Sequence, residues 1–126
     1  SMVPKAFAEL PNLIQGGPLL LNQGKVVLNG KAERFSSAFM RQKAPRSVVA
    51  SDGELIWLLA VEGQGNAGPT LRETAELMQK LGLKQALNLD GGSSTRLMVR
   101  NRGQSSGRGF GAAIHNGLGI VLSPNR

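Results

Sequence analysis

Short apolar runs separated by small polar residues dominate the pattern of this chain. Runs of this kind, bounded by Asn-x-Gly and Asp-Gly turns, are typical of β-hairpins. The run over residues 54–61 is apolar almost throughout, which predicts a central strand covered on both faces. The predicted strands are a short one before Gly16, then 19–21, 25–28, 47–50 and 54–61, and residues 31–45 are expected to form a basic loop or a short helix ending before Pro45.

One segment has helical spacing instead. Residues 70–81 place Leu71, Ala75 and Met78 on one apolar stripe that Thr74, Leu77 and Leu81 extend. Thr70 and Glu73 have the spacing of a capping box, and Gly82 predicts the end of the helix.

Strands are expected again at 86–89 and 96–99, then a Gly/Ser-rich loop over 101–112, then a closing strand in "AIHNGLGIVLS". The order of elements predicts an α+β fold with mostly antiparallel sheet and one main helix packed on a sheet face. The length of 126 residues fits a single domain spanning 1–126.

Composition narrows the function classes. The chain has 15 Lys and Arg against 8 Asp and Glu, a formal net charge of +7 that favours anionic partners. The basic residues are scattered and lack interleaved aromatic residues, which disfavours nucleic acid as the partner. Without cysteine, disulfides and thiolate chemistry are excluded, and the single His115 rules out a His-rich metal site. No apolar run reaches the roughly 20 residues of a membrane span.

The stretch "QALNLDGGSSTRLMV" (85–99) carries the candidate chemistry. A short buried strand ends at Asp90, so this carboxylate is expected at the surface on a rigidly held backbone. Gly91 and Gly92 would let the chain turn sharply and let a ligand approach backbone amides, while Ser93, Ser94 and Thr95 would add hydroxyl donors. A carboxylate beside such an anion-binding turn suits a reaction at a phosphate or sugar centre, although Asp-Gly-Gly-Ser is also an ordinary turn sequence.

The same stretch resembles the "LDGG(G)SS" signature of the phosphodiester glycosidase family. Four further segments resemble that family in the same order: "IQGGPLLLNQGK", "APRSVVASDGELIWLLAVEG", "GPTLRETAELMQKLGLKQ" and "NGLGIVL". Together they span residues 12 to 122. The family's upstream half is absent, so the chain resembles the C-terminal half of the usual domain.

The resemblance implies a glycosidase, a hydrolase acting on a sugar-1-phosphodiester or a related anionic cell-surface glycan. It implies Asp90 as the central catalytic carboxylate and Glu62 as the second one, since glycoside cleavage usually needs two. Arg46 would clamp the phosphodiester, because its planar fork pairs two oxygens. The remaining implied substrate-binding residues are Gly16, Gly17, Asn88, Gly91, Gly92, Ser93, Ser94 and Thr95.

Two other functions stay open: a non-catalytic module that binds phosphate or anionic glycans, and a basic nucleic-acid-binding domain. No metal ligands and no definite cofactor are predicted, although a divalent cation at Asp90 is compatible with the sequence. An oligomer is open if another chain supplies the missing half. The expected location is extracytoplasmic, periplasmic or secreted, with no signal in this chain.

Overall fold

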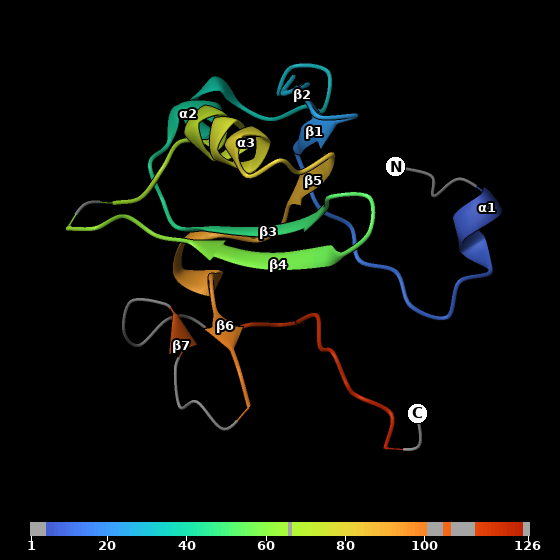
Figure 1. Ribbon diagram of the computed structural model, residues 1–126. Coiled ribbons are helices and arrows are strands. Elements are labelled where there is room, and N and C mark those ends of the chain that lie inside the picture. The colour runs from blue at the N-terminus through green and yellow to red at the C-terminus, as the bar shows by residue number, and fades with distance from the viewer. Residues whose placement is uncertain (1–4, 66, 101–104, 107–112, 125–126) are drawn as a thin grey trace.

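The computed structural model describes residues 5–65, 67–100, 105–106 and 113–124. The helices are α1 (Lys5–Ala8), α2 (Ser37–Arg41), α3 (Leu71–Lys80) and the 3₁₀ turn η1 (Gly92–Ser94). The strands are β1 (Leu19–Asn22), β2 (Lys25–Val26), β3 (Arg46–Ser51), β4 (Ile56–Val61), β5 (Gln85–Asn88), β6 (Leu97–Met98) and β7 (Ser105–Ser106). In Figure 1 α2 and α3 lie together on one side of the main sheet.

Within the described residues the main sheet has five strands in the order β2-β1-β5-β3-β4, and every neighbouring pair is antiparallel. The two predicted hairpins are confirmed. Gln23 and Gly24 both have positive φ at the first turn, as a two-residue hairpin turn requires. The α+β class with one main helix on a sheet face is therefore confirmed.

Helix α3 begins and ends where the sequence predicts. The Thr70 hydroxyl accepts from the Glu73 amide at 3.2 Å, and the Glu73 carboxylate accepts from the Thr70 amide at 2.7 Å. At the other end Gly82 has φ of +78°, the left-handed conformation that stops the helix. Its buried face packs on β1 and β2, and the core consists of Leu20, Leu21, Val48, Ala50, Leu71, Ala75, Met78, Leu83 and Ala86.

Three predicted strands differ from the structure. The run over 54–61 is not central: among the described strands, β4 lies at the edge, and Ile56 is 67% exposed. The segment before Gly16 and the segment 113–123 are apolar but have no strand partner in the described chain, so they stay irregular. Apolar sequence predicts that a segment can be buried, whereas strand formation also needs a neighbour to complete the hydrogen bonds. Of the predicted 101–112 loop, only Ser105 and Ser106 are described, and they pair with β6.

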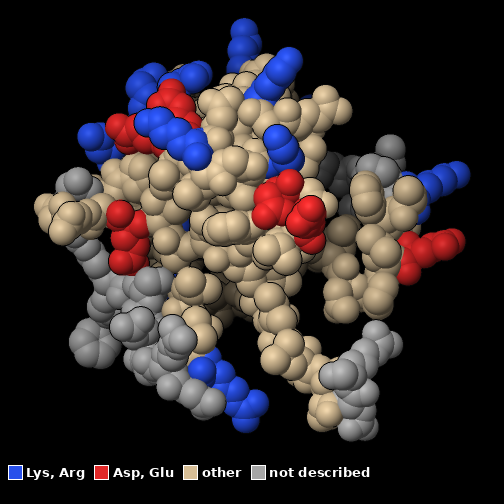
Figure 2. Space-filling model, in the orientation of Figure 1, with Lys and Arg blue, Asp and Glu red and all other residues tan. Residues whose placement is uncertain are grey.

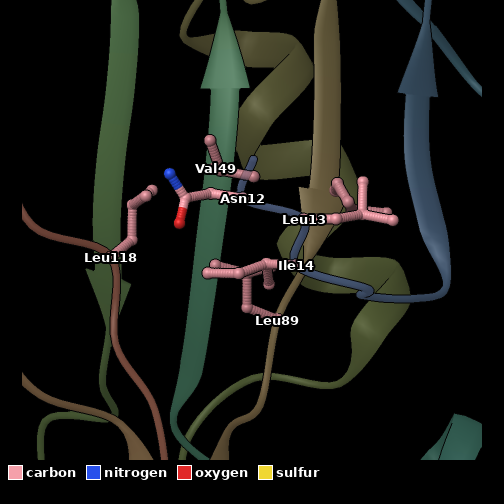
Figure 3. A pocket seen from close by; sticks show the side chains of 7 residues that line it. Asn12, Leu13, Ile14, Val49, Leu89 and Leu118 are labelled. Carbon is pink, nitrogen blue, oxygen red and sulfur yellow. The ribbon is translucent and has the colours of Figure 1, made fainter. Parts of the chain in front are cut away.

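The sheet face opposite α3 is only partly covered. Figure 3 shows Asn12, Leu13 and Ile14 near Val49 and Leu89 of the sheet side, with Leu118 beside them, around a hollow of about 190 Å³. The total accessible surface is 9745 Å², whereas a compact monomer of 13.3 kDa exposes about 6,500 Å². Segment 113–124 is among the exposed parts of the described chain, and Val121 within it is 92% exposed.

None of the helices that the structure describes combines the length and the apolar character needed to cross a bilayer.

The capping box gives a direct test of how α3 is held. Thr70→Ala removes the hydroxyl that accepts from the Glu73 amide, so we expect the free energy of unfolding to fall by about 1 kcal/mol. Thr70→Ser keeps the oxygen and serves as the control. Equal loss in both variants, measured by urea denaturation, would show that the methyl group rather than the cap matters.

Candidate functional site

The sheet topology brings the predicted site segments to one end of the sheet. Strand β5 ends at Asn88 just before Asp90, while its antiparallel neighbours β3 and β1 begin at this same end. Arg46 pairs with Val61, so β4 also ends here and places Glu62 at the same edge. Segments separated by more than 70 residues in the sequence therefore meet around the motif.

Gly16 and Gly17 lie directly against the end of β5. The Gly17 amide donates to the Asn88 carbonyl at 2.7 Å, and the Asn88 side-chain amide donates to the Gly17 carbonyl at 2.9 Å. A Cβ added at Gly16 would lie 2.7 Å from that same Asn88 carbonyl. Glycine is required here because the two backbones touch. The peptide bond between Gly17 and Pro18 is cis.

Gly91 makes a second backbone contact on the other side of β5. An added Cβ would lie 2.8 Å from the Pro45 carbonyl and 3.6 Å from the Arg46 Cα. The next residue, Gly92, donates its amide to the Pro45 carbonyl at 2.8 Å and has φ of +61°. The motif is thus fixed to the start of β3 by its backbone.

The turn offers fewer amides than the sequence analysis expects. The Ser94 amide donates to Gly91 and the Thr95 amide to Gly92, which closes η1. Together with the Gly92 bond to Pro45, these contacts leave the amides of Gly91 and Ser93 without a backbone acceptor in the described chain. The predicted hollow of successive amides is therefore reduced to these two donors and the hydroxyls beside them.

The carboxylate of Asp90 is exposed and accepts no hydrogen bond from any residue that the structure describes. Asp52, also in a tight turn, shows the opposite arrangement. Its carboxylate accepts from the Leu55 and Glu54 amides at 2.8 Å and from the Trp57 indole at 3.0 Å, and these bonds lower its pKa to about 2. Asp90 is therefore available for a ligand, whereas Asp52 is used by its own hairpin.

Glu62 is likewise exposed and without a hydrogen-bond partner among the described residues. It follows the last residue of β4 at the site end of the sheet. Both carboxylates predicted for catalysis are thus unpaired within the described chain, and they follow the ends of β5 and β4, with β3 between these two strands.

Arg46 is placed differently from the predicted clamp. Its side chain is only 2% exposed and points to the helical side, where its guanidinium donates to the backbone carbonyls of Gln42 and Pro69. The guanidinium carbon lies 5.7 Å from the centre of the Phe39 ring. Burial lowers the pKa of Arg46 below its usual value. In the described residues no carboxylate neutralises this buried cation, so a positive charge remains beneath the start of β3.

Two buried oxygens near the turn have no hydrogen-bond partner in the described structure: Asn88 Oδ1 and Thr95 Oγ1. Asn88 is 2% exposed and Thr95 is 1% exposed. The Thr95 oxygen lies 3.8 Å from the position of a Cβ at Gly91. Unpaired buried polar atoms are rare in folded proteins and concentrate where strain or function retains them.

Sequence reasoning missed three residues that position the site, all within the segment 31–45 interpreted as a basic loop or a short helix. Pro45 supplies the carbonyl that fixes Gly92, Glu33 binds the Leu19 amide with both carboxylate oxygens at 3.1 Å, and the Phe35 ring packs on Gly17. No periodicity marks these residues, because each acts through a single contact to a distant segment.

The described chain contains no group of three or more His, Cys, Asp or Glu side chains arranged to hold a metal ion. A divalent cation at Asp90 would therefore need further ligands besides this carboxylate. Binding of such a cation stays a prediction.

Comparison with known proteins gives three results. Residues 1–121 match the family model described as phosphodiester glycosidase. One similar solved structure is that of a hypothetical protein from Synechocystis, which is 47% identical to this chain and has a TM-score of 0.69. The second is the catalytic domain of zebrafish N-acetylglucosamine-1-phosphodiester alpha-N-acetylglucosaminidase, auto-inhibited by its pro-peptide, 28% identical with a TM-score of 0.55.

The match covers 83% of this chain but 20% of the Synechocystis chain, and 66% of this chain but 31% of the zebrafish chain. This chain therefore spans less than a third of either structure. No curated protein matches the sequence.

The two motif glycines are expected to respond differently to substitution. In Gly91→Ala the new Cβ would meet the Pro45 carbonyl, so the turn must move away from β3. In Gly92→Ala the space is open and only the positive φ is unfavourable, at a cost of about 1–2 kcal/mol. We expect Gly91→Ala to shift the amide resonance of Arg46, with Gly92→Ala leaving it in place. Identical spectra would contradict the close contact.

The hydrogen bonds of the Asp52 carboxylate can be tested through the pH dependence of the unfolding free energy. A folded-state pKa of about 2, below the value near 3.9 expected in the unfolded chain, stabilises the fold above pH 4, and this contribution is lost as the pH falls towards 2. Asp52→Asn should therefore flatten the fall in unfolding free energy over that interval. An unchanged fall of the unfolding free energy in Asp52→Asn would contradict the low pKa of this carboxyl.

Proposed function

Because this chain belongs to the phosphodiester glycosidase family, we propose that it carries the catalytic carboxylate of a hydrolase acting on a sugar-1-phosphodiester or a related anionic cell-surface glycan. The zebrafish protein described above is such an enzyme by its name. The observation that carries the proposal is the exposed, unpaired Asp90 on a backbone fixed by glycine contacts on both sides.

The chemistry asks little of the leaving group, because a phosphate monoester departs readily from an anomeric carbon. The main requirement is a carboxylate that activates water or attacks that carbon, and we assign this role to Asp90. Glu62, unpaired at the same edge, is the second carboxylate. The rigid backbone under Asp90 would keep it oriented towards the reacting centre.

Charge and hydrogen bonding support an anionic ligand here. Arg46 is a buried cation that no described carboxylate neutralises, and an unpaired buried charge is costly unless an opposite charge approaches. Its guanidinium is held by Gln42 and Pro69, so we propose that it acts through its field rather than as an exposed clamp. The Gly91 and Ser93 amides and the Ser93 hydroxyl are the groups placed to contact phosphate oxygens.

A binding module without catalysis is the second candidate. It is supported by the amides of Gly91 and Ser93, which have no backbone acceptor in the described chain, and by the buried cation of Arg46, because both suit an anion without requiring a reaction. We propose an extracytoplasmic location for this chain under either of the two functions.

Replacing Asp90 distinguishes the two candidates. Asp90→Asn should reduce cleavage of a chromogenic sugar-phosphodiester by at least about 100-fold while leaving the melting temperature unchanged. Asp52→Asn, the same chemical change in another turn, is the control and should retain activity. Wild-type cleavage rates in Asp90→Asn would remove Asp90 from the chemistry, and binding of the substrate by a wild type that never cleaves it would favour the binding module.

A further inference from the structure

A second hollow lies beside the candidate site, on the side of helix α2. It measures about 610 Å³, within the range of small-ligand sites. Three basic residues line it, Lys31, Arg34 and Arg41, and no acidic residue does. Figure 2 shows many of the visible Lys and Arg side chains over the upper part of the molecule, where Figure 1 places α2 and α3.

The hollow has a fixed shape because the loop before α2 is closed by its own hydrogen bonds. The Phe35 amide donates to the Gly30 carbonyl at 2.7 Å, and the Arg34 amide donates to the Lys31 carbonyl at 3.2 Å. Arg34 has φ of +64°, which few non-glycine residues adopt. Gly30 is packed so closely on Met40 that an added Cβ would overlap its sulfur.

The loop also separates its charges. Glu33 lies between the two basic loop residues in sequence, yet its carboxylate binds the Leu19 amide and lies near Gly17. Among the described residues, Lys31, Arg34 and Arg41 have neither an ion-pair nor a hydrogen-bond partner for their side chains. The hollow is thus lined by three unneutralised cations, with the one acid of the loop committed elsewhere.

Hydroxyl and aromatic groups complete the lining. Ser36 accepts from the Phe39 amide at 3.1 Å, which leaves its hydroxyl proton available, and Ser37 adds a second hydroxyl. Phe35 lines the hollow and also lies 3.0 Å from the position of a Cβ at Gly17, at the candidate site. One aromatic side chain therefore separates the hollow from the glycine pair.

We propose that this hollow binds a second phosphate group of the substrate, carried on a sugar that lies against Phe35. The inference rests on the proposed function and deepens it: the substrate is a glycan bearing at least two phosphate groups, one at the Asp90 turn and one among Lys31, Arg34 and Arg41. Cations and hydroxyls suit phosphate oxygens, and an aromatic ring suits the apolar face of a sugar. A nucleic acid fits less well, because the cations gather in one hollow with a single lining aromatic ring.

Binding tests the hollow without requiring activity. The triple variant Lys31→Gln, Arg34→Gln, Arg41→Gln is compared with Arg72→Gln, Lys80→Gln, Lys84→Gln, which removes the same charge from exposed positions elsewhere. Inorganic phosphate and glucose 1,6-bisphosphate are titrated into each, and amide shifts are followed by NMR. We expect wild-type shifts to centre on residues 30–41 and the Kd to rise at least about tenfold in the first variant but less than twofold in the second.

Equal weakening in both triple variants would overturn the proposal, since only general charge attraction would then remain. So would the absence of binding to the wild-type chain, or shifts centred away from residues 30–41. Should the first triple variant fold poorly, the single change Lys31→Gln, with Lys80→Gln as its control, gives the same comparison.

Two further measurements separate this inference from the proposed function. The triple variant at Lys31, Arg34 and Arg41 should keep the wild-type kcat and KM on a substrate that carries one phosphodiester and no other phosphate. On a substrate that carries an additional phosphate, its KM should be raised. An unchanged KM on both substrates would refute the second site. Asp90→Asn should bind phosphate at the hollow as the wild type does. A result that removes Asp90 from the chemistry would therefore not affect the proposed second phosphate site. A single-stranded oligonucleotide that occupies the hollow more tightly than glucose 1,6-bisphosphate would overturn the glycan assignment.

Discussion

The close approach of three backbones at the end of β5 is the constraint on which the rest of the site depends. Gly16 and Gly17 lie against Asn88 on one side, and Gly91 lies against Pro45 and Arg46 on the other. No side chain separates these segments, so hydrogen bonds between main-chain groups fix their positions. Because the strands are themselves held by the core under α3, the exposed Asp90 inherits the rigidity of the sheet.

Charge at this end of the molecule is arranged in layers. Asp90 and Glu62 are exposed and have no partner among the described residues, whereas Arg46 at the start of β3 is buried, with its guanidinium on backbone carbonyls and the Phe39 ring. Asn88 and Thr95 add buried oxygens without partners in the described chain. Buried polar oxygens are normally paired, so Asn88 Oδ1 and Thr95 Oγ1 are atoms that a donor from a ligand or an ordered water would satisfy.

Local signals in the sequence predicted the local structure well. The capping box, the helical stripe and Gly82 located α3, and the Asp-Gly and Asn-x-Gly turns located both hairpins. Where the outcome depended on distant partners, the sequence did not suffice. Residues 54–61 read as a central strand because they are apolar on both faces, yet β4 is an edge strand in the described chain. Arg46 reads as a surface clamp, and only the fold reveals Gln42, Pro69 and Phe39 around it.

The glycine contacts also constrain how this site can diversify. Side chains cannot be introduced at Gly16 or Gly91 without separating the backbones, so drift at these positions would damage the sheet and the turn together. The exposed side chains of Lys31 and Arg41 have no such restriction, because they line the hollow without a close backbone contact of this kind. We therefore expect differences in anion preference among related proteins to lie at these basic positions, while the glycines around Asp90 stay unchanged.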